Sequence, residues 1–215
     1  MKNELFKRIL SSIILIPLVF LTIYLGSYYF NFLILVCLLI ISYEWYAMTK
    51  KKLYILFGYC FLIFSFYSIY KIRNIYDEGF EFVFLIMIIC ICSDIGGFLF
   101  GKIFKGPKLT KLSPNKTYSG VVGAYLLTIS TIYFLENQNV IFNLKILSSL
   151  NIYLYIILVS TMSQIGDIFI SYFKRLSKIK DTGKIIPGHG GLLDRADGMI
   201  FAFPFSYIIF LLVEI

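Results

Sequence analysis

The sequence predicts an all-α, polytopic integral membrane protein with about seven transmembrane helices and a cytoplasmic N-terminus. Apolar residues make up 59% of the 215-residue chain, against about 45–50% in soluble proteins. They fall in long runs rather than in an amphipathic pattern, which is typical of helices in lipid. No alternating strand pattern appears, which leaves helices as the spanning form.

Seven apolar runs define the expected spans in chain order. Each approaches the roughly 20 residues that a helix needs to cross about 30 Å of hydrocarbon. The first follows basic residues, like a signal peptide, but no small-residue cleavage site comes after it, so we expect a retained helix. The last is short unless it begins inside the polar segment before it. The runs cover residues 9–25, 30–47, 53–70, 82–100, 119–135, 152–172 and 198–213.

The distribution of Lys and Arg predicts the orientation. With the N-terminus inside, 17 of the 20 basic residues lie in the cytoplasm, and only Lys71, Arg73 and Lys145 lie outside. Residues 1–80 then form N-terminal transmembrane helices, and residues 81–215 form a catalytic transmembrane region in the cell membrane. Its cytoplasmic loops, 101–118 and 173–197, are the candidates for function.

Neither charge nor cysteine content points to another class of protein. The net charge of +8 does not require nucleic acid, because basic residues of membrane proteins face anionic lipid on the cytoplasmic side. The cysteines lie in apolar runs with no histidine nearby, so we interpret them as packed hydrophobic residues rather than zinc ligands. They are Cys37, Cys60, Cys90 and Cys92.

Acidic residues cluster around the second loop. Asp167 belongs to a stripe of polar residues, spaced four, four and three apart, that lies along one face of the sixth span. Asp194 and Asp197 are three apart at the start of the last span, so both can project from one helical face. Together with Asp181, these oxygens suit Mg²⁺ rather than zinc. The alternatives are a structural hydrogen-bonding stripe and capping of a helix by acids.

Glycines and arginines of the same loop favour a phosphate. The turn Gly188-His189-Gly190-Gly191 has backbone N–H groups that phosphate oxygens can approach, and it leads into a helix N-terminus. Two of the four arginines, Arg175 and Arg195, lie here, where a planar bidentate donor can hold phosphate. In the other loop, Ser113, Lys116 and Thr117 could hold phosphate or ribose, or they belong to a basic loop on anionic lipid.

These motifs together resemble the signature of the phosphatidate cytidylyltransferase (CDP-diacylglycerol synthase) family. The similar segments lie within residues 93–198. Ser119, Asn115 and Ala196 depart from the family pattern, which affects the 113–120 loop more than the reaction. The matching runs are Asp94-Ile-Gly96, Ser113-Pro114-x-Lys116-Thr117-x-x-Gly120, Ser163-Gln164-Ile-Gly166-Asp167, Ser171-Tyr-Phe-Lys174-Arg175, Lys180-Asp181-Thr-Gly183 and Pro187-Gly-His189-Gly190-Gly191-Leu-Leu-Asp194-Arg195-Ala-Asp197.

The resemblance implies transfer of a cytidylyl group from CTP to phosphatidic acid, drawn from the inner leaflet, by a homodimer. Because the second pKa of a phosphate monoester is near 6, the attacking phosphate needs no general base, and we expect His189 to bind phosphate. Expected ligands of Mg²⁺, with a second cation as an option, are Asp167, Asp194 and Asp197. Expected catalytic residues are Lys174, Arg175, Lys180, Asp181, His189 and Arg195. Expected substrate-binding residues are Ser113, Lys116, Thr117, Ser171, Gly188, Gly190 and Gly191.

Two other functions fit parts of the pattern. A CTP-dependent lipid kinase would share the membrane architecture and the metal, but the signature from Lys180 to Asp197 favours cytidylyl transfer. A transporter using buried acids would place them near mid-span, in broken helices of paired halves. The acids of this chain instead lie close to one surface.

Overall fold

The computed structural model describes residues 2–50, 52–75, 78–110, 113, 116–138, 151–185 and 190–213, with the backbone alone for residues 2–10, 12 and 75. The described residues form helices joined by loops, with one isolated β-bridge between Lys108 and Thr117. In chain order the helices are α1 (Lys2–Leu25), α2 (Ser27–Thr49), α3 (Ile55–Ile75), α4 (Gly79–Phe104), α5 (Tyr118–Asn137), α6 (Ile152–Leu176), α7 (Leu193–Ala196) and α8 (Met199–Val213).

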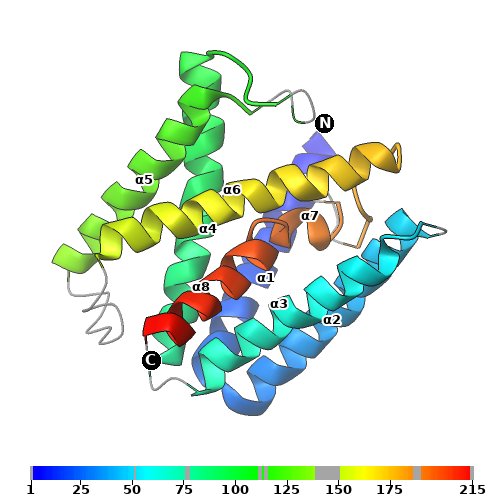
Figure 1. Cartoon of the computed structure of the whole chain (residues 1–215), viewed down its shortest axis with the longest axis horizontal. Coiled ribbons are helices and arrows are strands. Elements are labelled where there is room, and N and C mark those ends of the chain that lie inside the picture. The colour runs from blue at the N-terminus through cyan, green and yellow to red at the C-terminus, as the bar shows by residue number, and fades with distance from the viewer. Residues whose placement is uncertain are drawn as a thin grey trace.

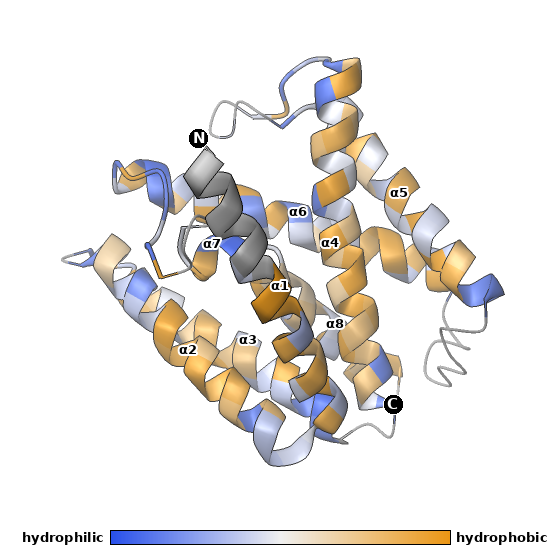
Figure 2. Ribbon diagram, turned by 180° about the vertical axis from the view of Figure 1, so that it is seen from behind, coloured by the Kyte–Doolittle hydropathy of each residue, from blue (hydrophilic) through white to orange (hydrophobic). Residues whose placement is uncertain are grey.

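A helix lies at each of the seven expected spans. Within the described residues, five helices, α2 to α6, are long and apolar enough to cross a membrane, while residues 13–25 of α1 and all of α8 form shorter apolar helices. Figure 2 shows apolar residues along the helices and polar residues at helix ends and in the loops after α4 and α6. The all-α prediction is confirmed, and the chain has the composition of a multi-pass membrane protein.

Two pairs of helices, α2 with α3 and α4 with α5, lie on either side of helix α8. Figure 1 shows α4 beside α5 and α2 beside α3, with α6 crossing α4. Helix α8 packs against α3, α4 and α6, so it lies between the two pairs. The segment that precedes α8 is thereby held at the junction of α6 and the α2–α3 pair.

Glycines allow α4 and α5 to approach closely. A Cβ atom added to Gly96 would lie 2.5 Å from the carbonyl oxygen of Gly123, and one added to Gly120 would lie 2.7 Å from the carbonyl oxygen of Gly97. Such small-residue contacts are common where membrane helices pack. At the start of α5, the Thr117 side chain accepts a hydrogen bond from the Gly120 N–H at 3.1 Å, which caps the helix. The loop between α4 and α5 is therefore fixed at its C-terminal end, where α5 begins.

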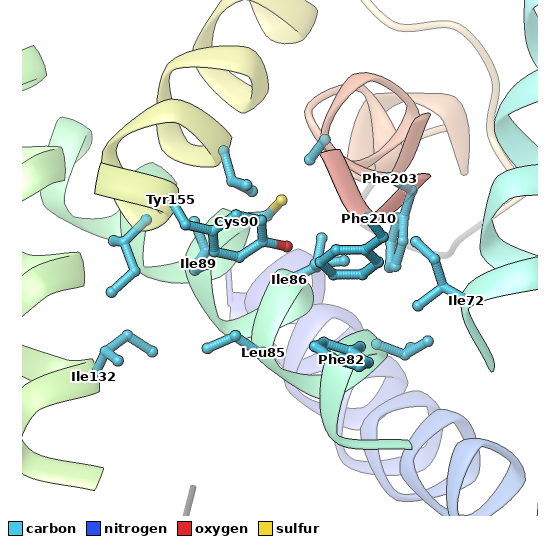
Figure 3. Close-up of a cluster of buried hydrophobic side chains, with 14 of the residues drawn as sticks. Ile72, Phe82, Leu85, Ile86, Ile89, Cys90, Ile132, Tyr155, Phe203 and Phe210 are labelled. Carbon is cyan, nitrogen blue, oxygen red and sulfur yellow. The ribbon is translucent and has the colours of Figure 1, made fainter. Parts of the chain in front are cut away.

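An aromatic and aliphatic core joins α4, α6 and α8 (Figure 3). The Phe210 ring lies 4.5 Å from Phe82 and 5.9 Å from Tyr155, between ring centroids. The buried Tyr155 hydroxyl donates to the Ser206 hydroxyl at 3.0 Å, so its polar end is satisfied. This core fixes α8 relative to α4 and α6.

A second buried cluster joins α2, α3, α6 and α7. The Trp45 ring meets Phe173 edge-to-face at 5.1 Å, and the Leu193 side chain is fully buried in the same cluster. The Ser177 hydroxyl donates to the Met48 carbonyl at 2.7 Å. Both ends of the loop between α6 and α7 are therefore anchored on α2.

Candidate active site

Asp194, on the short helix α7, organises the loop between α6 and α7. Its Oδ1 accepts a hydrogen bond from Lys174 Nζ at 2.8 Å, and its Oδ2 accepts from the backbone N–H groups of Thr182 at 2.7 Å and Gly191 at 3.1 Å. Burial alone would raise the pKa of Asp194, but the Lys174 ammonium and the two N–H groups outweigh burial and lower the pKa. One carboxylate thus ties α6 to two separate parts of the loop.

A cavity of about 230 Å³ opens between α4, α5 and α6. Lys116 lies in it and forms an ion pair with Asp167 (Nζ to Oδ2, 2.6 Å), and the same ammonium donates to the Gln164 carbonyl at 3.1 Å. The Lys116 side chain retains 21% of its accessible surface, so its charge is available to a bound anion. The lining residues are Ser93, Asp94, Gly97, Phe98, Ser113, Lys116, Thr117, Gly120, Val121, Gln164 and Asp167.

Three carboxylates from different parts of the chain interact electrostatically, and two of them, Asp94 and Asp167, line this cavity. Asp94 lies on α4, Asp167 on α6, and Asp197 between α7 and α8. Asp197 is 8% exposed, and its pKa is raised well above the ordinary carboxyl value by burial and by the negative charges of Asp167 and Asp94. The Gly198 N–H donates to Asp197 Oδ1 at 2.9 Å. Lys116 pairs with Asp167, and the Lys174 ammonium acts against the rise in the pKa of Asp197.

Two glycines bring Asp197 against α6. A Cβ atom on Gly166 would lie 2.6 Å from the Asp197 carbonyl oxygen, and one on Gly198 would lie 2.3 Å from the Ser163 hydroxyl. The contact therefore excludes larger residues at either position. It explains why Asp197 lies close to the part of α6 that carries Asp167.

The predicted polar stripe of α6 faces the interior. Ser163 is fully buried and Ser171 is 9% exposed. The Ser171 hydroxyl donates to Asp167 Oδ1 at 3.3 Å, and Lys174 continues the stripe to Asp194. The residues of this helix thus connect the cavity with the loop.

The other predicted residues divide by location. Ser113, Lys116 and Thr117 line the cavity. Gly190 (φ +91°) and Gly191 belong to the loop around Asp194, where the positive φ of Gly190 favours glycine. Gly188 and His189 lie outside the described residues. Four of the predicted catalytic residues are exposed in or beside the loop: Arg175, Lys180, Asp181 and Arg195.

Sequence reasoning missed two acidic residues. Asp94 was noted as part of a motif but not assigned to the site, although an acid in an apolar run is itself a signal of function. Glu44, on α2, is 1% exposed and accepts hydrogen bonds from Leu192 N–H at 3.0 Å and Leu193 N–H at 2.8 Å. The same signal marks Glu44, as an ionisable residue within the second apolar run.

The donor chemistry of the carboxylate cluster fits a hard divalent cation. As placed, no group of three or more His, Cys, Asp or Glu side chains in the described part of the chain could hold one metal ion. A cation beside Asp94, Asp167 and Asp197 would, however, oppose both causes that raise the pKa of Asp197, which are burial first and then repulsion by Asp167 and Asp94. Carboxylate oxygens are the ligands that Mg²⁺ prefers. Mg²⁺ itself stays a prediction.

Comparison with known proteins identifies the family. The model of the cytidylyltransferase family matches residues 6–71 and 52–213. A phosphatidate cytidylyltransferase of Rickettsia felis is 36% identical, over 98% of this chain and 94% of that protein. One of Rickettsia conorii is 38% identical, over 93% and 88%, and one of Bacillus subtilis is 34% identical, over 75% and 56%. With matches along nearly its whole length, this chain belongs to the cytidylyltransferase family.

Proposed function

We propose that this chain transfers the cytidylyl group of CTP to phosphatidic acid, giving CDP-diacylglycerol and pyrophosphate for phospholipid synthesis. A phosphate oxygen of phosphatidic acid attacks the α-phosphorus of CTP. The bond from that phosphorus to the oxygen that bridges to the β-phosphate breaks, and pyrophosphate leaves. The observation that carries the proposal is the family membership of a chain whose signature residues meet beside a cavity that contains a lysine.

Bringing two polyanions together requires cations, and the site is rich in them. Lys174 is held at 2.8 Å from Asp194, which fixes its ammonium at the end of α6. Arg175, Lys180 and Arg195 lie exposed around the same loop. In the proposed mechanism these groups stabilise the charge that develops on the leaving pyrophosphate. Gly188, His189, Gly190 and Gly191 are proposed to hold its oxygens, and Asp181 to orient the cations beside it.

Phosphatidic acid is proposed to bind in the cavity between α4, α5 and α6. Lys116 would contact its phosphate, and Ser113 and Thr117 offer hydroxyl donors from the same wall. Phe98 and Val121 supply an apolar side for the glycerol and the start of the acyl chains. Ser171, one turn beyond Asp167, keeps that carboxylate oriented toward the cavity.

Mg²⁺ is the proposed metal, with a second cation as an option. When bound it would neutralise phosphate charge and polarise the α-phosphoryl group. The proposed ligands are Asp167, Asp194 and Asp197, and the position of Asp94 supports it as a further ligand. Oδ1 of Asp194 accepts from Lys174 alone among the described donors, so a lone pair is left for a metal.

The proposed topology has seven spans in the cell membrane, a cytoplasmic N-terminus and a site that faces the cytoplasm. It is supported by the 17 basic residues that this orientation places inside. Substrate supply agrees with it, because CTP is a cytoplasmic solute and phosphatidic acid would enter from the inner leaflet. The family resemblance further supports a homodimer.

The test is reconstitution of the purified protein in liposomes that contain phosphatidic acid. With CTP and Mg²⁺ supplied, we expect pyrophosphate release that depends on phosphatidic acid, together with CDP-diacylglycerol detected by mass spectrometry. Liposomes that contain phosphatidylcholine alone are the control. Formation of CDP and a newly phosphorylated lipid would instead identify a lipid kinase, and an absence of product would overturn the proposal.

A further inference from the structure

Glu44 connects the N-terminal helices to the signature loop. It lies on α2, about 140 residues before the loop in sequence, and only 1% of its surface is exposed. Nothing in the proposed chemistry uses it. A carboxylate buried to this extent needs partners, and all its described partners belong to the loop.

The hydrogen bonds of Glu44 bind two separate parts of that loop. Its Oε1 accepts from the Leu192 N–H at 3.0 Å, and its Oε2 accepts from the Leu193 N–H at 2.8 Å. Its Oε2 also lies 3.1 Å from the Thr182 hydroxyl. The Thr182 N–H in turn donates to Asp194. Glu44 and Asp194 therefore hold the same two segments, residues 182–183 and 191–194, from opposite sides.

Two glycines of the signature fit around the Glu44 carboxylate. A Cβ atom on Gly183 would lie 2.5 Å from Oε1, and one on Gly191 would meet the Thr182 hydroxyl first and lie 2.7 Å from Oε2. The Gly191 N–H donates to Asp194, so the backbone is held on the other side as well. Close contact with Glu44 accounts for glycine at position 183, and close contact with Glu44 and Thr182 together accounts for glycine at position 191.

We propose that Glu44 is a positioning residue for CTP: it holds the signature loop in the conformation that presents its cations to the polyphosphate. This proposal rests on the proposed function. Glu44 contacts backbone atoms and one hydroxyl, not the reacting groups, so it acts through the loop. Because Lys116 and the cavity belong to α4, α5 and α6, the binding of phosphatidic acid does not depend on it.

The test compares Glu44→Gln and Glu44→Ala with wild type in steady-state kinetics. Gln keeps the shape but presents an NH₂ donor where a carboxylate oxygen met an N–H group. We expect kcat/KM for CTP to fall about 10- to 100-fold, with the KM for phosphatidic acid within about twofold of wild type. Glu136→Gln, which changes an exposed carboxylate at the far end of α5, is the matched control and keeps both values.

A second pair of variants tests the contact itself. Gly183→Ala alone places its methyl group against Glu44 Oε1 and lowers kcat/KM for CTP. In the Glu44→Ala background the obstacle is gone, so adding Gly183→Ala costs no further activity. Additive losses would show that Gly183 acts independently of Glu44 and would overturn the proposal.

The outcomes separate this inference from the proposed function. Wild-type protein that forms no CDP-diacylglycerol refutes the function itself. Active wild type with unchanged Glu44→Gln kinetics refutes the positioning role. Equal losses with both substrates, or a Glu44→Gln protein that does not fold, assign Glu44 to general stability and also overturn the proposal.

Discussion

Replacement of Asp194 by Asn distinguishes two roles of this residue in the protein without metal. Asp194 either holds the loop together through its hydrogen bonds, or it is only a metal ligand that other carboxylates repel. As placed, its carboxylate accepts hydrogen bonds from Lys174, Thr182 and Gly191, and its side chain is 8% exposed. Asn keeps one acceptor oxygen, and its NH₂ group must face either the ammonium or the backbone donors. If Asp194 only repelled other metal ligands, its replacement by Asn would not lower the stability of the protein.

The expected magnitude follows from these contacts. Removing one member of a buried, hydrogen-bonded ion pair costs about 3–5 kcal/mol, and the unsatisfied N–H groups fall within that figure. Asp197→Asn is the control, because Asp197 is a carboxylate three residues away that is more deeply buried but is repelled by Asp94 and Asp167. Neutralising it removes that repulsion, so the free energy of unfolding changes by at most about 1 kcal/mol.

The assay is unfolding by sodium dodecyl sulfate in mixed micelles with EDTA, followed by tryptophan fluorescence. Trp45 is the only tryptophan of the chain, and it packs against Phe173, next to Lys174. Its signal therefore reports on the region that Asp194 holds. An Asp194→Asn protein as stable as wild type in EDTA would refute the organising role, and greater stability would place Asp194 in a cluster of repelling ligands.

Two further predictions concern the cavity and the helix pair beside it. Lys116→Met removes the cation that pairs with Asp167 at 2.6 Å. We expect kcat/KM for phosphatidic acid to fall about 10- to 100-fold, with KM for CTP unchanged. Unchanged kinetics with both substrates would show that Lys116 does not belong to the site. Gly96→Ala places a methyl group 2.5 Å from a backbone carbonyl oxygen of α5 and should destabilise the protein by about 1–3 kcal/mol in the same unfolding assay. Gly97→Ala should be tolerated, because the atom nearest to its methyl group lies at 3.9 Å. Equal stability of the two variants would contradict the packing of α4 on α5.

Periodicity along single helices predicted much of this arrangement. The apolar runs located the long helices, and the spacing of Ser163, Asp167, Ser171 and Lys174 placed them on one face. Both follow from local geometry, since 3.6 residues per turn determines which side chains share a face. The sequence could not say what that face meets.

Patterns within one helix do not predict which residues of distant helices an acidic side chain contacts. Glu44 is a single acid in an apolar run, and its donors are backbone N–H groups far along the chain. No side-chain pattern marks a backbone donor. The approach of Asp94 to Asp197 likewise depends on how α4, α6 and α8 pack, through their shared apolar core and the close contacts at Gly166 and Gly198.

The fates of the α-phosphate and the γ-phosphate of CTP show whether this chain catalyses cytidylyl transfer. Purified protein in liposomes with phosphatidic acid and Mg²⁺ receives CTP labelled either on the α-phosphate or on the γ-phosphate. Cytidylyl transfer predicts α-label in the lipid fraction and γ-label in pyrophosphate, in equal amounts. Label from the γ-phosphate in lipid, or no lipid-bound label from either nucleotide, would contradict it.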